Sequence, residues 1–239
     1  MWEIEPYYAT TAGKTFADIC ALFDTVYVSF YKGLSGATGA MLLCPSPLFM
    51  AEAKLWQRRS GGNSHTLLYE VVDCERGFNE NIGTFERKWN KMKDVAQAVT
   101  AASKDYTLQD GTPVVSFLVD PPTCCQGRVR FRGYTAKELD AARDVAQEKT
   151  NVRMYNNVVP KQTLDQKMEA DRDAAAEAEG KGQTRTEGQP ELNATDEQAD
   201  DRDHMIEWMM MSVTEKVPTE QYVEVVREFC RALRAQQKT

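Results

Sequence analysis

The sequence has few of the residues that hold metals or disulfide frameworks. It contains two histidines, His65 and His204, far apart in the chain, and its six cysteines include no C-x-x-C pair. Most cysteines lie in apolar segments such as ADICALF and REFCRAL, where reduced and buried thiols are expected. A chain of 239 residues with 42% hydrophobic residues can form a core without disulfides. We therefore predict neither a disulfide framework nor a metal site.

Long apolar runs are also absent. No segment approaches the roughly 20 apolar residues that cross a bilayer. The first residues, MWEIEPYYATT, have neither the basic stretch nor the apolar core of a secretory signal. These absences predict a cytoplasmic chain without a membrane partner.

Basic residues are not in excess, since the formal net charge is −7. Residues 165–203 hold thirteen acidic and five basic side chains, a balance of −8, so the rest of the chain carries −7 − (−8) = +1. The acidity therefore belongs to one segment and predicts no charged field at a folded site. The balance also gives no reason to expect a nucleic-acid partner.

The first part of the chain has the pattern of an α/β domain. TFADICALF predicts a helix, and the runs TVYVSFY and AMLLC predict two strands joined by the glycine-rich GLSGATG. Strands this apolar on both faces are typical of a sheet covered on both sides. PSPLFMAEAKLWQRRSGG predicts a further helix, opened by prolines and closed by glycines.

The clearest periodic pattern lies at 76–103, where apolar residues recur at spacings of four and three. We predict one long helix there, joining residues 1–75 of a large domain to a small α+β domain at 104–159. In the small domain, TPVVSFLVD, GRVRFRG and NVRMY predict strands, and Thr135 with Glu138 predicts a capping box. An acidic helix and flexible linker are expected over 160–203, and a strand and helix over 204–239 complete the small domain.

One lysine, Lys32, stands where the apolar run VYVSFY meets the glycine loop. A lysine at a strand end is commonly just the last solvated residue before a loop. The alternative is chemical, because partial desolvation lowers the pKa of a lysine and a neutral amine condenses with aldehydes. The pattern alone leaves both interpretations open.

The segment FDTVYVSFYKGLSGATGAMLL closely resembles the cofactor-lysine segment of the threonine aldolase and β-eliminating lyase family. The resemblance extends through FMAEAKLWQRRSGGN and ERGFNENIGTFERKWNKMKDVAQAV, and more weakly to the C-terminal segments. It implies a partial large domain of the fold type I transferase-like class, the aspartate-aminotransferase type, plus a small α+β domain. It also implies pyridoxal 5′-phosphate as cofactor, with Lys32 as its covalent attachment point.

The implied function is that of a lyase acting on an amino-acid substrate, with a homo-oligomer as the full-length form. Cleavage of Cα–Cβ in a β-hydroxy amino acid would give glycine and an aldehyde, and β-elimination is the family's other outcome. In the family, a phosphate loop, a ring stacked on the cofactor and a D-x-A-R stretch precede the lysine. We expect their equivalents to precede Met1, because the D-x-A-R stretch of relatives lies just before a segment resembling LWE and this chain begins MWE.

Three further residues are candidates for the site. Ser29 could touch the cofactor phosphate or be an ordinary strand residue. Arg130, in the alternating GRVRFRG, could bind a substrate carboxylate or lie on the wet face of a strand. Arg59 could line the cofactor mouth, although its place at a helix end also explains a cation. A non-catalytic fragment that binds a full-length subunit is the rival function, and an RNA- or DNA-binding module around RVRFR is a third.

Overall fold

The computed structural model describes residues 2–63, 66–155, 159–160, 202–211 and 213–236. The chain divides into two compact units. Unit 1 comprises Met1–Ala98, Val119–Gly127 and Trp208–Tyr222, and unit 2 comprises Val99–Leu118, Arg128–Glu207 and Val223–Thr239. The predicted acidic helix and linker lie almost wholly outside the described residues. Within the described residues, no helix is long and apolar enough to span a membrane.

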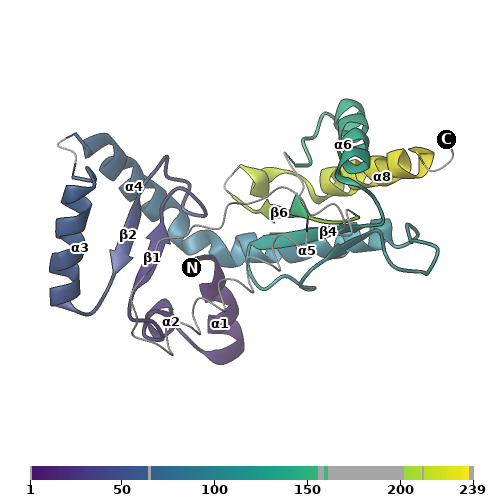
Figure 1. The fold of residues 1–239 in the computed structure, drawn as a ribbon. Helices are drawn as coiled ribbons and strands as arrows, with labels where there is room; N and C mark the ends of the chain where they lie inside the picture. Colours follow the sequence, from purple (N-terminus) through teal and green to yellow (C-terminus); the bar gives the residue numbers. More distant parts are fainter. Residues whose placement is uncertain (1, 64–65, 156–158, 161–201, 212, 237–239) are drawn as a thin grey trace, which may run out of the picture. The chain divides into compact units, whose positions relative to one another are not determined.

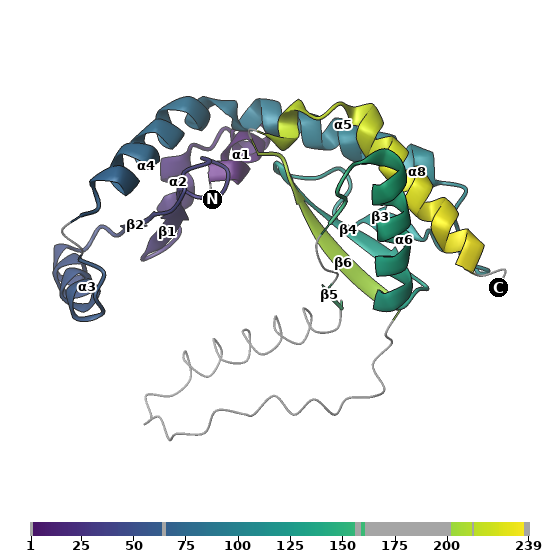
Figure 2. The same ribbon diagram turned by 90° about the horizontal axis from the view of Figure 1, so that it is seen from above.

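Unit 1 begins with helical segments and a strand pair. The elements are η1 (Trp2–Ile4), α1 (Glu5–Ala12), α2 (Phe16–Cys20), β1 (Val26–Ser29), β2 (Ala40–Leu43), α3 (Pro47–Arg59) and α4 (Leu68–Asn81). β1 and β2 form an antiparallel two-stranded sheet in which Val26 is opposite Leu43. Both strands, α2 and α3 follow the sequence prediction, whereas η1, α1 and the N-terminal part of α4 were not predicted. In Figures 1 and 2, α3 stands apart from the strand pair, and none of its residues is buried.

The strand pair is less covered than the sequence predicted. Val26 and Val28 of β1 are buried, but Tyr27 is 58% exposed, and no residue of β2 is buried. The expectation of a sheet covered on both faces is therefore wrong for this chain taken by itself.

The long helix predicted over 76–103 is divided. α4 ends at Asn81, a 3₁₀ turn η2 (Ile82–Thr84) follows, and α5 (Phe85–Ser103) continues the chain. Gly83, which has a low helix propensity, lies in the turn. The apolar stripe survives the break, because Phe85, Trp89 and Met92 are all buried.

Unit 2 contains most of a four-stranded sheet with the order β3–β4–β6–β5. Its strands are β3 (Val115–Phe117), β4 (Gln126–Arg132), β5 (Val159–Pro160) and β6 (Asp203–Met209). The helices α6 (Ala136–Thr150) and α8 (Thr219–Gln236) lie side by side in both ribbon views, and a 3₁₀ turn η3 (Thr214–Lys216) precedes α8. A bond from the Lys149 Nζ to Glu228, at 3.0 Å, links the two helices.

Several predictions for this part of the chain are confirmed. Thr135 and Glu138 form the capping box of α6, and β4 alternates buried and more exposed residues. Val225, Val226, Phe229 and Leu233 form the buried face of α8. The strand predicted at NVRMY is wrong, since residues 151–155 are in no strand. The assignment of five domain segments stays a prediction.

All six cysteines are present as thiols outside any disulfide. Cys125 and Cys230 are buried, and the other four are half-buried. Burial raises the pKa of both buried thiols to about 12. These two thiols are therefore protonated at neutral pH and fill space as small apolar groups.

Candidate active-site turn

Lys32 lies in the turn that follows β1. The turn is closed by three backbone hydrogen bonds: Phe30 N–H to Gly39 O at 2.9 Å, Gly36 N–H to Phe30 O at 2.8 Å, and Ser35 N–H to Lys32 O at 2.8 Å. These bonds fix the backbone on both sides of Lys32.

The Lys32 side chain is exposed, and Ser29, the last residue of β1, is half-buried. Ser29 thus ends the strand, and Lys32 follows three residues later in the turn. Because the Lys32 side chain is exposed, the described residues do not provide the partial desolvation that the sequence analysis considered.

Close packing against α4 shapes the same turn. A Cβ on Gly77 would lie 2.7 Å from the Leu34 carbonyl oxygen, so only glycine allows the helix to approach this closely. Ser35 adopts a left-handed conformation with φ of 59°. This conformation costs a non-glycine residue on the order of 1 kcal/mol, which the surrounding contacts must offset.

A second lysine, which the sequence interpretation missed, lies behind the turn. Lys88 of α5 is fully buried, and its Nζ donates to the Gly33 carbonyl and to Asn81 Oδ1, each at 3.1 Å. Burial lowers its pKa, and this effect outweighs the opposing negative charges of Glu215 and Glu3. Its spacing could have revealed it, because position 88 is three residues after Phe85 and therefore on the apolar stripe.

Glu3 is the other charged residue that the sequence interpretation missed. It is 8% exposed, and its Oε1 accepts the Gly33 N–H at 3.2 Å. Gly33 must be glycine here, since a Cβ would lie 2.6 Å from both Glu3 Oε1 and Phe85 Cε1. No periodic pattern marks Glu3, because it lies in a short 3₁₀ turn near the start of the chain.

The two predicted arginines lie in other elements. Arg130, in unit 2, pairs with Asp203 through two hydrogen bonds, one of them from Nε at 2.6 Å, and both side chains are about one-fifth exposed. A substrate carboxylate at Arg130 would compete with this partner. Arg59 is exposed at the end of α3, where its guanidinium lies 5.2 Å from the centre of the Trp56 ring.

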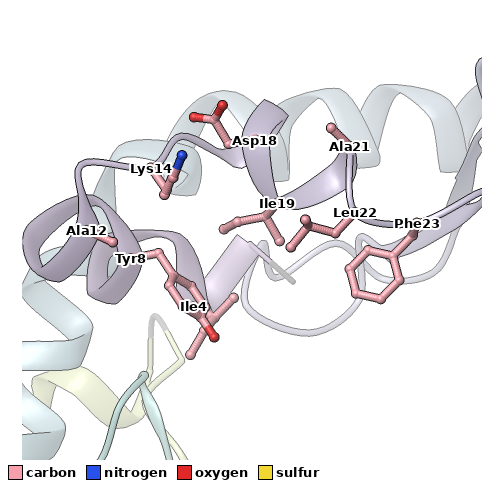
Figure 3. Close-up of a pocket in the computed structure, with 9 residues that line it drawn as sticks. All are labelled: Ile4, Tyr8, Ala12, Lys14, Asp18, Ile19, Ala21, Leu22 and Phe23. Atoms are coloured by element: carbon pink, nitrogen blue, oxygen red, sulfur yellow. The ribbon is translucent and has the colours of Figure 1, made fainter.

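A cavity of about 570 Å³ opens elsewhere in unit 1. Figure 3 shows apolar side chains of η1, α1 and the α2 region converging on it, with Lys14 and Asp18 on one side. Asp18 belongs to the capping box of α2, where it accepts from Thr15. The nine residues that line the cavity include none of the four predicted site residues.

Solved structures provide the comparison that bears on identity. A protein from Listeria monocytogenes, provisionally assigned as an L-allo-threonine aldolase, matches 97% of this chain with a TM-score of 0.66 and 24% identity. A protein from Exiguobacterium, provisionally assigned as an aromatic amino acid β-eliminating lyase/threonine aldolase, matches 97% with a TM-score of 0.67 and 21% identity. This chain shares their fold. No family model matches the sequence, and no curated protein does.

The shared fold confirms the resemblance at the level of architecture. The chain spans about half the length of these two proteins, with 49% and 50% of their chains covered. At 21–24% identity the likeness establishes the mixed helix-and-sheet fold alone. The roles of Lys32, Ser29, Arg130 and Arg59 stay predictions.

Proposed function

We propose that this chain carries the cofactor lysine of a pyridoxal-phosphate-dependent lyase of amino-acid metabolism. The observation that supports this most directly is the place of Lys32 in the hydrogen-bonded turn after β1, which matches the position of the family's cofactor lysine in the sequence resemblance. The fold shared with two provisionally assigned threonine aldolases supports the same class. The proposed reaction cleaves Cα–Cβ of a β-hydroxy amino acid to glycine and an aldehyde, and β-elimination is the alternative reaction.

The described residues fit the covalent anchor of such a cofactor. When bound, pyridoxal 5′-phosphate accepts the electrons of the bond broken at Cα. Lys32 would hold the cofactor through its amine, which is exposed. Ser29 would offer its hydroxyl to the phosphate, and a carboxylate-binding role for Arg130 or Arg59 stays a prediction from the sequence.

The test measures the visible absorbance of the covalent lysine–cofactor adduct in this chain combined with the half of the fold that it does not span. Lys32→Ala is expected to abolish this absorbance, because no other amine occupies the turn. Lys54→Ala, an exposed lysine of α3, is the control and should leave the absorbance unchanged. Equal cofactor binding by the Lys32→Ala protein would refute the proposal. Product analysis then separates the reactions, since aldol cleavage releases glycine and β-elimination releases ammonia.

A second candidate function is binding to a polypeptide of the same fold, without catalysis by this chain. The supporting observation is a set of exposed apolar side chains in unit 1, which we call the apolar face. Its members are Tyr27, Met41, Leu42, Leu48, Phe49, Trp56, Leu68, Tyr69, Val71 and Val72. The members come from β1, β2, α3 and α4, and exposed apolar surface is a common feature of protein–protein interaction sites.

The proposed occupant of the apolar face is the half of the fold that this chain does not span, supplied by a full-length subunit. The two related structures are about twice as long as the matched region, so each contains such a half. Co-purification of this chain with a full-length homologue would support binding. A soluble chain that stays monomeric and unbound beside that homologue would contradict it.

A further inference from the structure

The backbone of Gly33, the residue next to Lys32, is held by two buried charged side chains. Glu3 Oε1 accepts its N–H at 3.2 Å, and Lys88 Nζ donates to its carbonyl at 3.1 Å. Glu3 comes from η1 and Lys88 from α5, so two elements far apart in the sequence meet at this residue. Both polar groups of the Gly33 backbone are thereby fixed.

The residues after Gly33 are held in the same way from α4. Asn81 Nδ2 donates to the Leu34 carbonyl at 3.0 Å. The Arg76 guanidinium donates from Nη2 to the Ser35 carbonyl at 3.2 Å. Side chains of one helix therefore bind consecutive carbonyls of the turn.

Asn81 also connects the two sets of contacts. Its Oδ1 accepts from Lys88 Nζ at 3.1 Å, while its Nδ2 donates to Leu34 and to the Gly77 carbonyl. Asn81 is 5% exposed and Lys88 is fully buried. The result is a buried polar network directly behind the turn that carries Lys32.

Such a network is costly as a means of stabilising a fold. Removing an ammonium group from water costs free energy that two hydrogen bonds only partly return, and an apolar side chain of similar volume packs at lower cost. A network of this kind does, however, fix one geometry, because each donor and acceptor has a defined direction. The geometry fixed here is that of the backbone beside Lys32.

We propose that Lys88 and Glu3 are positioning residues that hold Gly33 and thereby set the direction in which Lys32 presents its amine. The proposal rests on the proposed role of Lys32 as the cofactor lysine. Neither residue touches the cofactor in this scheme, since both are buried behind the turn. They act through the backbone alone.

The experiment measures how selectively pyridoxal 5′-phosphate labels Lys32 in the full chain. The adduct is trapped with borohydride and located by peptide mass spectrometry, and Lys54 is the internal reference. Lys88→Met removes the two hydrogen bonds while keeping most of the volume. The Lys32 to Lys54 labelling ratio is expected to fall about tenfold, because loss of the Lys88 hydrogen bonds to Gly33 and Asn81 lets the turn move. Amide exchange at Gly33 and Leu34 should accelerate by a similar factor.

Two comparisons separate positioning from general stability. Lys91→Met changes the same residue type on the same helix, where Nζ donates to Thr219 Oγ1 at 2.8 Å, and it should keep the labelling ratio. Glu3→Gln retains an acceptor for Gly33 N–H and should keep the ratio, whereas Glu3→Ala should lower it. If Lys88→Met does not fold, the Glu3 pair gives the answer at a temperature where both variants are folded.

The outcomes are distinct. An unchanged labelling ratio in folded Lys88→Met, or equal ratios in Glu3→Ala and Glu3→Gln, overturns the proposal. A lowered ratio in Lys88→Met with a normal ratio in Lys91→Met supports it. If Lys32→Ala leaves the visible absorbance unchanged when this chain is combined with the half of the fold that it does not span, the proposed function fails. The labelling and exchange results still decide whether Lys88 and Glu3 hold the turn.

Discussion

Lys32 and Lys88 lie on two sides of the same turn and meet opposite environments. Lys32 is exposed, while Lys88 is fully buried and donates to Gly33 and Asn81. An ammonium group loses most of its favourable hydration on burial, so a buried lysine needs a specific reason to be present. Lys32 is therefore accessible from solvent, whereas the Lys88 amine is used in hydrogen bonds to the Gly33 carbonyl and to Asn81.

The burial of Lys88 predicts a pH dependence of stability. Its pKa is lowered from 10.5, chiefly by desolvation, so the unfolded chain binds more protons than the folded chain between the lowered pKa and about pH 10.5. The free energy of unfolding that Lys88 contributes therefore rises with pH in this window. The neighbouring charges of Glu215 and Glu3 oppose the pKa shift, and Arg87 adds to it.

Urea unfolding of wild type and Lys88→Met measures this effect. The stability difference between them, wild type minus variant, should grow from neutral pH toward about pH 10. The buried thiols of Cys125 and Cys230 have the opposite effect, but both proteins contain them. Lys91→Met controls for lost packing on α5. A difference that is flat or falls with pH would contradict the prediction.

Replacing Gly77 with alanine is expected to lower the free energy of unfolding, which is the opposite of the usual effect of alanine in place of a helical glycine. Alanine in place of an exposed helical glycine normally stabilises a protein by about 1 kcal/mol. At Gly77 the added Cβ would lie 2.7 Å from the Leu34 carbonyl and 3.1 Å from the Gly36 nitrogen, both backbone atoms. Gly77→Ala should therefore lower the free energy of unfolding by about 1–3 kcal/mol.

Gly83→Ala is the matched control, because an added Cβ there has no neighbour within 4 Å. Thermal or urea unfolding should show no loss of stability for this variant. Equal effects of the two substitutions would mean that the turn does not pack against α4 as described.

At the scale of elements, the helix capping boxes and the apolar periodicity determined which helices the sequence could predict. α6 was predictable because Thr135 and Glu138 form a local capping box, and α8 because one face carries a full apolar stripe. The break at η2 was missed because the stripe continues through it in the sequence. The strand at 151–155 was predicted wrongly, since apolar content alone does not supply a hydrogen-bonded neighbour.

The candidate site was predictable only in its local part. Lys32 and Ser29 were singled out by the strand, lysine and glycine turn together with the family resemblance, and their roles stay predictions. Glu3 and Lys88 reach the same turn from 30 and 55 residues away along the chain. The spacing of Lys88 marks it as a residue of the apolar stripe, but nothing in the sequence pairs it or Glu3 with Gly33, so these contacts required a structure.

The capping box of α6 predicts a defined loss of stability. Thr135 Oγ1 accepts the Glu138 N–H at 3.3 Å, and Glu138 Oε2 accepts the Thr135 N–H at 2.8 Å. Thr135→Ala should lower the free energy of unfolding by about 1 kcal/mol. Thr100→Ala, at an exposed position in α5, is the control and should be neutral or slightly stabilising because alanine has the higher helix propensity. A neutral Thr135→Ala would show that the cap contributes nothing measurable.

At the scale of the whole molecule, the chain spans half of the two related structures, and the apolar face of unit 1 is left uncovered. Each large apolar side chain that a partner buries contributes about 1.5–3 kcal/mol. Burial of the apolar face would therefore favour the proposed association with the half of the fold that this chain does not span.

A double substitution at the start of α4 tests the apolar face. Leu68 and Tyr69 are 69% and 84% exposed, and glutamate in the first turn of a helix is favoured by the helix dipole, so Leu68→Glu with Tyr69→Glu should leave α4 intact. Sedimentation should show association with a full-length homologue weakened at least about tenfold, because two apolar contacts become charges. Val213→Glu, at an exposed valine outside the apolar face, is the control and should not change association. Unchanged association of the double variant would mean that the partner binds elsewhere on this chain.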